Sequence, residues 1–252
     1  MGETIVFTVN NVIMKTKIKF IYSAFVLIAL MSFSSCTEDS AGISKVTTFP
    51  VITVLGAPSI GVAKGIPYVD PGFKAMEGTK DITSNVVIKG AVDVNKSGAY
   101  FLVYEATNSD GFKRSESRTV IVYDKSSIST ADISGVYTST IKRKVLTTGV
   151  LASRGPYSIV ITKLADGLFI IDDLLGGWYY YGSAYGVGYA GLGYVVLKAD
   201  NTLSIAYSTI PSWSDSVKFF AASTYNPASG TILLNSMMNA STNYEFAVTL
   251  IK

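Results

Sequence analysis

The stretch AYFLVYEA, residues 99–106, alternates its side chains in a way that decides the fold class. Tyr100, Leu102 and Tyr104 recur at every second position, so in an extended strand all three face the same side. Similar runs rich in Val, Ile, Tyr and Thr, each bounded by turn residues, are RTVIVYD (118–124), YSIVITK (157–163), YVVLK (194–198) and YEFAVTLIK (244–252). No stretch after residue 36 keeps helical periodicity over three turns. The sequence therefore predicts an all-β protein.

The runs fall into two sets, and the segment between them is polar. DKSSISTAD, residues 124–132, contains no glycine and is typical of a linker. We therefore predict one domain over residues 50–124, a linker over 125–132 and a second β domain over 133–252. Each domain is expected to fold alone, and residues 36–49 are expected to form a tether in front of them.

The first domain resembles the bacterial Ig-like domain named after a pesticidal crystal protein. The matching segments are PVITVLG (50–56), GIPYVDPGFKA (65–75), DITSNV (81–86) and GAYFLVYEATNSDGF (98–112). The resemblance implies a β-sandwich that serves as a spacer or adhesion module. Calcium needs several oxygen ligands, and the residues before Asp81 supply no second acid, so we predict turn-forming roles for Asp70 and Asp81 and no metal site.

The second domain resembles an uncharacterised C-terminal domain of Bacteroidetes lipoproteins. The matching segments are ISGVY (133–137), IDDLLGGWYYYG (171–182), YNPASGTI (225–232) and the final YEFAVTLIK. Seven or eight antiparallel strands would fit the spacing, either closed as a barrel or packed as two sheets. The sequence leaves both arrangements open.

Cys36 is the only cysteine, and it follows a secretion signal. Lys15, Lys17 and Lys19 precede an apolar run of 13 residues, 20–32, which is too short to span a bilayer. Residues 1–35 are therefore interpreted as a start assigned too early, with Met14 as the natural one, plus a signal peptide. The small residues before Cys36 resemble the bacterial lipobox, which implies that its sulfur carries a lipid anchor.

Two acids follow the cysteine and predict where the anchored protein faces. Glu38 and Asp39 resemble the export signal that sends Bacteroidetes-type lipoproteins to the cell exterior. The expected location is the outer membrane, with the protein lipid-anchored and facing outward, and the membrane is thus a predicted partner.

Composition argues against several function classes. The chain has no histidine, which excludes Ser-His-Asp and Cys-His catalysis and the usual zinc sites. Its 21 basic and 18 acidic residues form no basic stripe, so no nucleic-acid partner is expected. Asp172 and Asp173 are adjacent and would point to opposite faces of a strand, unlike a glycosidase pair, so we assign them to a turn. We predict a non-enzyme without cofactor or metal.

One segment favours ligand binding. GGWYYYGSAYGVGYAGLGY, residues 176–194, holds one tryptophan and six tyrosines among seven glycines, and aromatic rings with polar edges gather at binding surfaces. The alternative is that these rings fill the core or cover a barrel end. We predict ligand-binding roles for Trp178, Tyr179, Tyr180, Tyr181 and Trp213, with at least one of Trp178 and Tyr180 stacking on a neutral sugar chain.

The predicted function is therefore a surface-exposed, non-catalytic glycan-binding lipoprotein. Its partners would be an extracellular polysaccharide and the outer-membrane proteins of an uptake system. Two alternatives remain: a structural or adhesive protein that binds another protein, and a hydrolase with a carboxylate pair.

Overall fold

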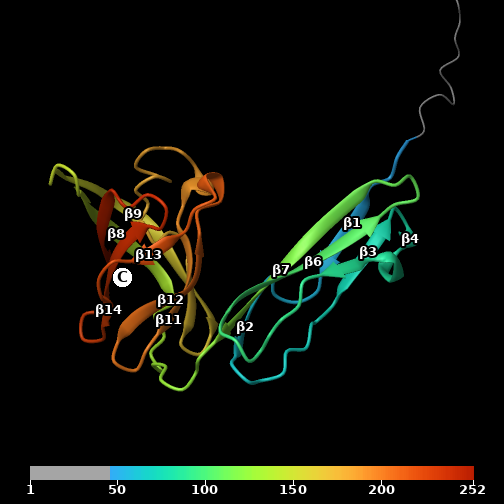
Figure 1. The fold of residues 1–252 in the computed structure, drawn as a ribbon, viewed down its shortest axis with the longest axis horizontal. Helices are drawn as coiled ribbons and strands as arrows, with labels where there is room; N and C mark the ends of the chain where they lie inside the picture. Colours follow the sequence, from blue (N-terminus) through green and yellow to red (C-terminus); the bar gives the residue numbers. More distant parts are fainter. Residues whose placement is uncertain (1–45) are drawn as a thin grey trace, which may run out of the picture. The chain divides into compact units, whose positions relative to one another are not determined.

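A computed structural model describes residues 46–252 (Figure 1). Regular structure in this part of the chain is β-strand apart from three short 3-10 helices, so the all-β prediction is confirmed. Residues 48–252 form one compact unit. Within residues 46–252 no helix is long and apolar enough to cross a membrane. The predicted signal peptide, Cys36, Glu38 and Asp39 lie outside the described residues.

The first domain is a sandwich of two sheets, as predicted (Figure 1). Its strands are β1 (Pro50–Val54), β2 (Ser59–Ala63), β3 (Phe73–Glu77), β4 (Lys80–Asp81), β5 (Val87–Lys89), β6 (Gly98–Thr107) and β7 (Lys113–Tyr123). One sheet has the order β1-β3-β4 and the other β2-β7-β6-β5. Leu102 and Tyr104 are buried in the core and Tyr100 packs against it, so the alternation in β6 placed these side chains correctly.

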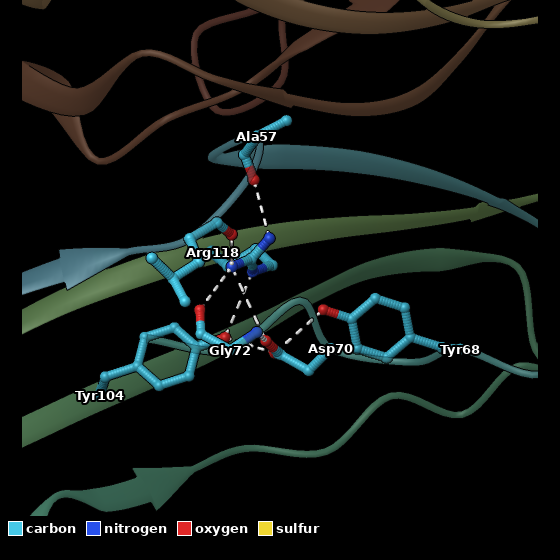
Figure 2. A network of polar contacts seen from close by, with 7 residues as sticks. Ala57, Tyr68, Asp70, Gly72, Tyr104 and Arg118 are labelled. Carbon is cyan, nitrogen blue, oxygen red and sulfur yellow. Dashed lines mark hydrogen bonds and ion pairs between the residues drawn. The ribbon is translucent and has the colours of Figure 1, made fainter. Parts of the chain in front are cut away.

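A charged pair lies inside this sandwich (Figure 2). Arg118 is fully buried and donates to the carbonyl oxygens of Leu55 at 2.6 Å, Ala57 at 2.9 Å and Gly72 at 3.1 Å. Asp70 lies 3.7 Å from the Arg118 guanidinium and accepts hydrogen bonds from the hydroxyls of Tyr68 and Tyr104. The Gly72 N–H also donates to Asp70, at 2.6 Å. The turn-forming role predicted for Asp70 is thereby confirmed.

Asp81 also holds a turn. Its carboxylate accepts the N–H of Thr83 at 2.8 Å, at the start of the short helix Thr83–Asn85. Within residues 46–252 no group of three or more His, Cys, Asp or Glu side chains is placed to hold a metal ion.

The second domain is a closed antiparallel barrel (Figure 1). Its strands are β8 (Gly135–Val145), β9 (Leu151–Ala165), β10 (Leu168–Ile171), β11 (Leu192–Leu197), β12 (Thr202–Thr209), β13 (Val217–Phe219), β14 (Ser223–Asn226), β15 (Thr231–Met238) and β16 (Tyr244–Ile251). Eight of them close into a ring because β15 pairs with β16 and β16 pairs with β8. The short β13 pairs with β15 farther along from β14. Of the two arrangements that the sequence left open, the barrel is the one formed.

Alternating side chains fill the barrel. Large buried members of this core are Tyr137, Ile141, Ile159, Phe169, Val195, Leu234, Phe246 and Val248. Leu174, Leu175 and Trp178, from the connection between β10 and β11, belong to the same core. The connection therefore folds into the barrel as part of its packing.

Apart from the two domain cores, a third apolar cluster, which we call the shared cluster, joins side chains of β7 to side chains of the barrel strands. Its buried members are Ile121, Tyr123, Leu168, Tyr194 and Val196. The predicted linker also contacts the barrel, because Ile128 forms a β-bridge with Lys198 and the N–H of Ser129 donates to the carbonyl of Leu197 at 3.0 Å.

Candidate ligand-binding site

The connection between β10 and β11, residues 172–191, is held together by one carboxylate. Asp173 is 1% exposed and accepts the N–H groups of Leu175 at 2.8 Å, Gly177 at 3.0 Å and Gly191 at 2.9 Å. Burial raises the pKa of Asp173 to about 6, although the three N–H donors oppose the rise. The side chain thus joins both ends of the connection, which confirms the turn role predicted for it.

Trp178 has no free face, and its prediction as a stacking ring is wrong. It is 1% exposed and makes an edge contact with Phe246, with ring centroids 5.8 Å apart. Gly176 and Gly177 have φ values of 70° and 94°, which only glycine adopts readily, and the resulting turn directs the chain into the barrel. Since residues 176–182 form turns and no strand, the alternation used to expose this ring does not apply.

An exposed aromatic surface lies next to Trp178, and we call it the aromatic platform. It consists of Tyr179, Tyr185, Tyr189 and Trp213. Tyr179 is 9% exposed and forms its base, whereas Tyr185 is 55% and Trp213 38% exposed. The Trp213 ring lies 4.7 Å from Tyr179, 5.0 Å from Tyr189 and 6.4 Å from Tyr185, always nearly perpendicular.

Two loops build the platform, and they fit together closely. Tyr185 and Tyr189 belong to the β10–β11 connection, whereas Trp213 ends the short helix Pro211–Trp213 after β12. A Cβ atom on Gly188 would lie 2.3 Å from the Ser212 hydroxyl oxygen, so the loops meet where Gly188 has no side chain. The rings are therefore held in place by packing, which lowers the entropy lost when a ligand binds.

Tyr180 and Tyr181 form a separate pair. Their ring centroids lie 3.9 Å apart, and Tyr181 stacks on Tyr157 at 5.7 Å. Tyr181 is 41% exposed and Tyr180 is half-buried. Neither makes a ring contact with the platform among the residues that the structure describes. Of the five predicted ligand-binding residues, the structure brings together only Tyr179 and Trp213 on the platform.

Two members of the platform, Tyr185 and Tyr189, were not predicted from the sequence. Both residues lie in the glycine-rich segment 176–194, but they are separated from the four consecutive aromatic residues, 178–181, for which ligand binding was predicted. Exposure at position 185 depends on turns that composition does not specify, and the contact with Trp213 is made across more than twenty residues of chain.

Comparisons with known proteins agree with the two-part organisation. A family model for a bacterial surface protein Ig-like domain matches residues 52–122, and a family model described as a C-terminal domain matches residues 126–252. Neither description names a catalytic activity. Among curated proteins the comparison found no match.

Solved structures add one substantial relative. The crystal structure of the lipoprotein BT2262 from Bacteroides thetaiotaomicron is 36% identical, with a TM-score of 0.47, and the match covers 81% of this chain and 100% of that one. The structure of CBM51-2 in complex with GlcNAc and INT domains from Clostridium perfringens ZmpB is 20% identical over 48% of this chain and 28% of that one, with a TM-score of 0.26. The latter match is too distant to support a function.

Coverage and identity decide the family. The C-terminal family model spans half of the chain, and the match to BT2262 extends over that protein's whole solved length. The chain therefore belongs to the family of Bacteroides-type surface lipoproteins that includes BT2262, with a surface Ig-like domain ahead of the C-terminal barrel.

Proposed function

We propose that this lipoprotein is a non-catalytic glycan-binding protein of the outer membrane. The barrel domain binds an extracellular polysaccharide through the aromatic platform, and the Ig-like domain serves as a spacer. Outer-membrane uptake proteins then receive the bound polysaccharide. The observation that carries this proposal is the exposure of Tyr185 and Trp213, two rings held rigidly at the surface.

The packing of the platform supports binding over core filling. The barrel interior is already filled by its own side chains, so Tyr185 and Trp213 are not needed there. Tyr and Trp offer a flat apolar face on which a sugar ring stacks and a polar edge that bonds its hydroxyls. Exposing two such rings side by side is costly in water, and a ligand that covers them recovers that free energy.

The carboxylates support a non-catalytic role. A glycosidase needs two carboxylates that face each other across a cleft. The oxygens of Asp173 are occupied by three backbone N–H groups. Its neighbour Asp172 is half-buried with one carboxylate oxygen lacking a hydrogen-bond partner in the described structure, and burial raises its pKa, so it is the carboxylate of this connection that favours the hydrolase alternative.

One surface favours the alternative of a protein partner. Val136 and Val160 lie directly opposite each other on β8 and β9 and are 62% and 41% exposed. An adhesive protein could use such an apolar pair. The platform nevertheless presents larger and more rigid groups.

Ring truncation tests the proposal. In the purified protein we expect Trp213→Ala to weaken polysaccharide binding by about 1–3 kcal/mol, measured by affinity electrophoresis and calorimetry across a polysaccharide panel, with little change in melting temperature. Trp178→Ala should instead cost about 3–5 kcal/mol of stability because it empties the barrel core. Phe220→Ala is the matched control, since Phe220 is also 38% exposed and makes no ring contact with the platform among the described residues. The proposal fails if no polysaccharide binds, or if Trp213→Ala binds as the wild type does.

The location is tested separately. We propose that lipid on Cys36 anchors the protein and that Glu38 and Asp39 direct it to the cell exterior. Cys36→Ala should move the protein from the membrane fraction to the soluble fraction. Replacing Glu38 and Asp39 with Ala should preserve the membrane attachment but remove access to protease added outside the cells. Sedimentation of Cys36→Ala with membranes would contradict the anchor.

A further inference from the structure

Two arginines pack against the Trp178 ring. The guanidinium carbon of Arg154 is 4.4 Å from the ring centroid and that of Arg143 is 4.5 Å from it. Arg143 also covers the ring of Tyr244, at 4.6 Å. Both arginines are half-buried. Two rings thus pack against the Arg143 guanidinium, and a cation held in this way can still donate its terminal N–H groups to an acceptor in its own plane.

Some cations in the described part of the chain pair with an acid, and these two half-buried arginines do not. Arg118 lies beside Asp70, Lys89 and Lys113 share Glu105, and Lys125 and Lys163 pair with Asp166. No ion pair found in residues 46–252 includes Arg143 or Arg154.

Their hydrogen bonds leave much donor capacity unused. Arg154 donates from one nitrogen to the Trp178 carbonyl at 2.9 Å and to the Ser183 hydroxyl at 2.7 Å. The Arg143 Nε is buried and has no hydrogen-bond partner within the described part of the chain. A guanidinium has five N–H donors and forms its strongest hydrogen bonds with carboxylate, sulfate-like or phosphate-like oxygens.

The arginines border the aromatic platform. Tyr179, which follows Trp178 in the chain, forms the base of the platform and contacts both Trp213 and Tyr185. Burial raises the pKa of Tyr179, and the Arg143 guanidinium nearby opposes that rise through its charge and through a hydrogen bond to the Tyr179 hydroxyl. Of the two acids of the same connection, Asp173 is buried with its oxygens occupied, and Asp172 forms no ion pair with either arginine in the described residues.

We infer that the ligand is an acidic polysaccharide, whose sugars stack on Tyr185 and Trp213 while a carboxylate or sulfate group pairs with Arg143. This inference rests on the proposed function and replaces the neutral sugar chain that the aromatic run suggested. Arg154 holds Trp178 and the Ser183 turn in place and adds positive charge, whereas Arg143 supplies its terminal N–H groups, since its Nε is buried.

Binding to matched polysaccharides tests the inference. The purified protein is assayed against polygalacturonate, which carries carboxylates, dextran sulfate, which carries sulfates, and neutral dextran. We expect one of the two acidic chains to bind at least about tenfold more tightly than dextran, as charged hydrogen bonds require. The chain that binds identifies the anionic group, and raised salt should weaken this binding.

Arg143 variants locate the charge. Arg143→Met keeps a long apolar side chain over Trp178 and should lose about tenfold or more in affinity for the acidic chain. Lys142→Gln removes the same charge from the exposed next position of β8 and should change affinity by less than about twofold. If Arg143→Met does not fold, Arg143→Lys retains the charge but not the planar fork, and it should bind more weakly than wild type with an unchanged melting temperature.

The outcomes separate this inference from the proposed function. Equal binding of neutral and acidic chains, with Arg143→Met unchanged and Trp213→Ala impaired, overturns the acidic ligand and leaves glycan binding in place. Equal losses in Arg143→Met and Lys142→Gln overturn the specific role of Arg143. Binding of no polysaccharide overturns both proposals.

Discussion

The half-buried Asp70 and the buried Arg118 show what a charge pair does in the Ig-like domain. Arg118 donates to three carbonyl groups, those of Leu55, Ala57 and Gly72, and thereby links the turns that contain them. Burial pushes the pKa of Asp70 upward, but hydrogen bonds from Tyr104, the Gly72 N–H and Tyr68, together with the Arg118 charge, outweigh burial and hold the pKa below its ordinary value. The pair joins turns of the sandwich, which is a structural role.

This lowered pKa predicts acid sensitivity. An unfolded aspartate has a pKa of about 3.9, so below about pH 4 the unfolded chain binds the proton more readily than the folded one. The stabilisation by Asp70 is therefore present above about pH 4 and is lost as the pH falls through the folded pKa. In urea titrations followed by far-UV circular dichroism, wild-type stability should fall more steeply from pH 5 to pH 3 than that of Asp70→Asn. Parallel slopes would contradict this role.

Among the connections, the one between β10 and β11 depends most on glycine. Gly176 has a φ of 70°, and a Cβ atom there would lie 2.7 Å from the Ser139 hydroxyl and 2.7 Å from a Val248 methyl. Gly186 has a φ of 94°, but nothing lies within 4 Å of its Cβ position. One glycine is thus required by backbone and packing together, the other by the backbone alone.

The two positions form a matched pair of variants. Gly186→Ala should cost about 1 kcal/mol of unfolding free energy, the strain of a non-glycine residue at positive φ. Gly176→Ala should cost about 1–3 kcal/mol more because the methyl group overpacks the barrel core. Tryptophan fluorescence during urea unfolding reports this domain, since both tryptophans lie in it. Equal costs would show that the connection does not pack inside the barrel as described.

Alternation in the sequence predicted strands better than it predicted loops. β6 and β16 place apolar side chains at every second position, and their burial follows that pattern. The conformation of residues 172–191 depends on positive-φ glycines and on Asp173, which accepts a hydrogen bond from Gly191. The run of consecutive aromatic residues does not predict this contact between the two ends of the connection. The sequence therefore indicated the aromatic segment and Trp213, but it did not show that Trp178 is buried while Trp213 is exposed.

Across the whole of residues 48–252, some strands are apolar on both faces. LFII in β10 and YVVL in β11 lack a polar alternate, and such continuous apolar runs are typical of strands covered on both sides. Phe169 and Val195 face the barrel core, whereas Leu168 and Val196 join Ile121 of β7 in the shared cluster. The pattern was visible in the sequence, but it does not say what covers the outer face.

This shared cluster sets the last prediction, which concerns the expectation that each domain folds alone. Leu168, Tyr194 and Val196 are 0%, 5% and 8% exposed in the whole unit, and removing the Ig-like domain would bring them into water. Each buried apolar side chain contributes roughly 1.5–3 kcal/mol at most. We therefore expect the fragment 125–252 to fold but to be about 2–4 kcal/mol less stable than 46–252, measured by urea unfolding with tryptophan fluorescence.

Two substitutions distinguish the shared cluster from the barrel core. Leu168→Ala should cost about 2–3 kcal/mol in 46–252 but less than about 1 kcal/mol in 125–252, where its side chain is already in water. Phe169→Ala should cost about 3–5 kcal/mol in both, because the barrel core surrounds it in either case. If the fragment and the longer chain unfold at the same urea concentration, and Leu168→Ala costs the same in each, the cluster adds nothing to stability and the domains are independent. A lower midpoint for the fragment together with a context-dependent cost at Leu168 would instead mean that the Ig-like domain stabilises the barrel that carries the aromatic platform.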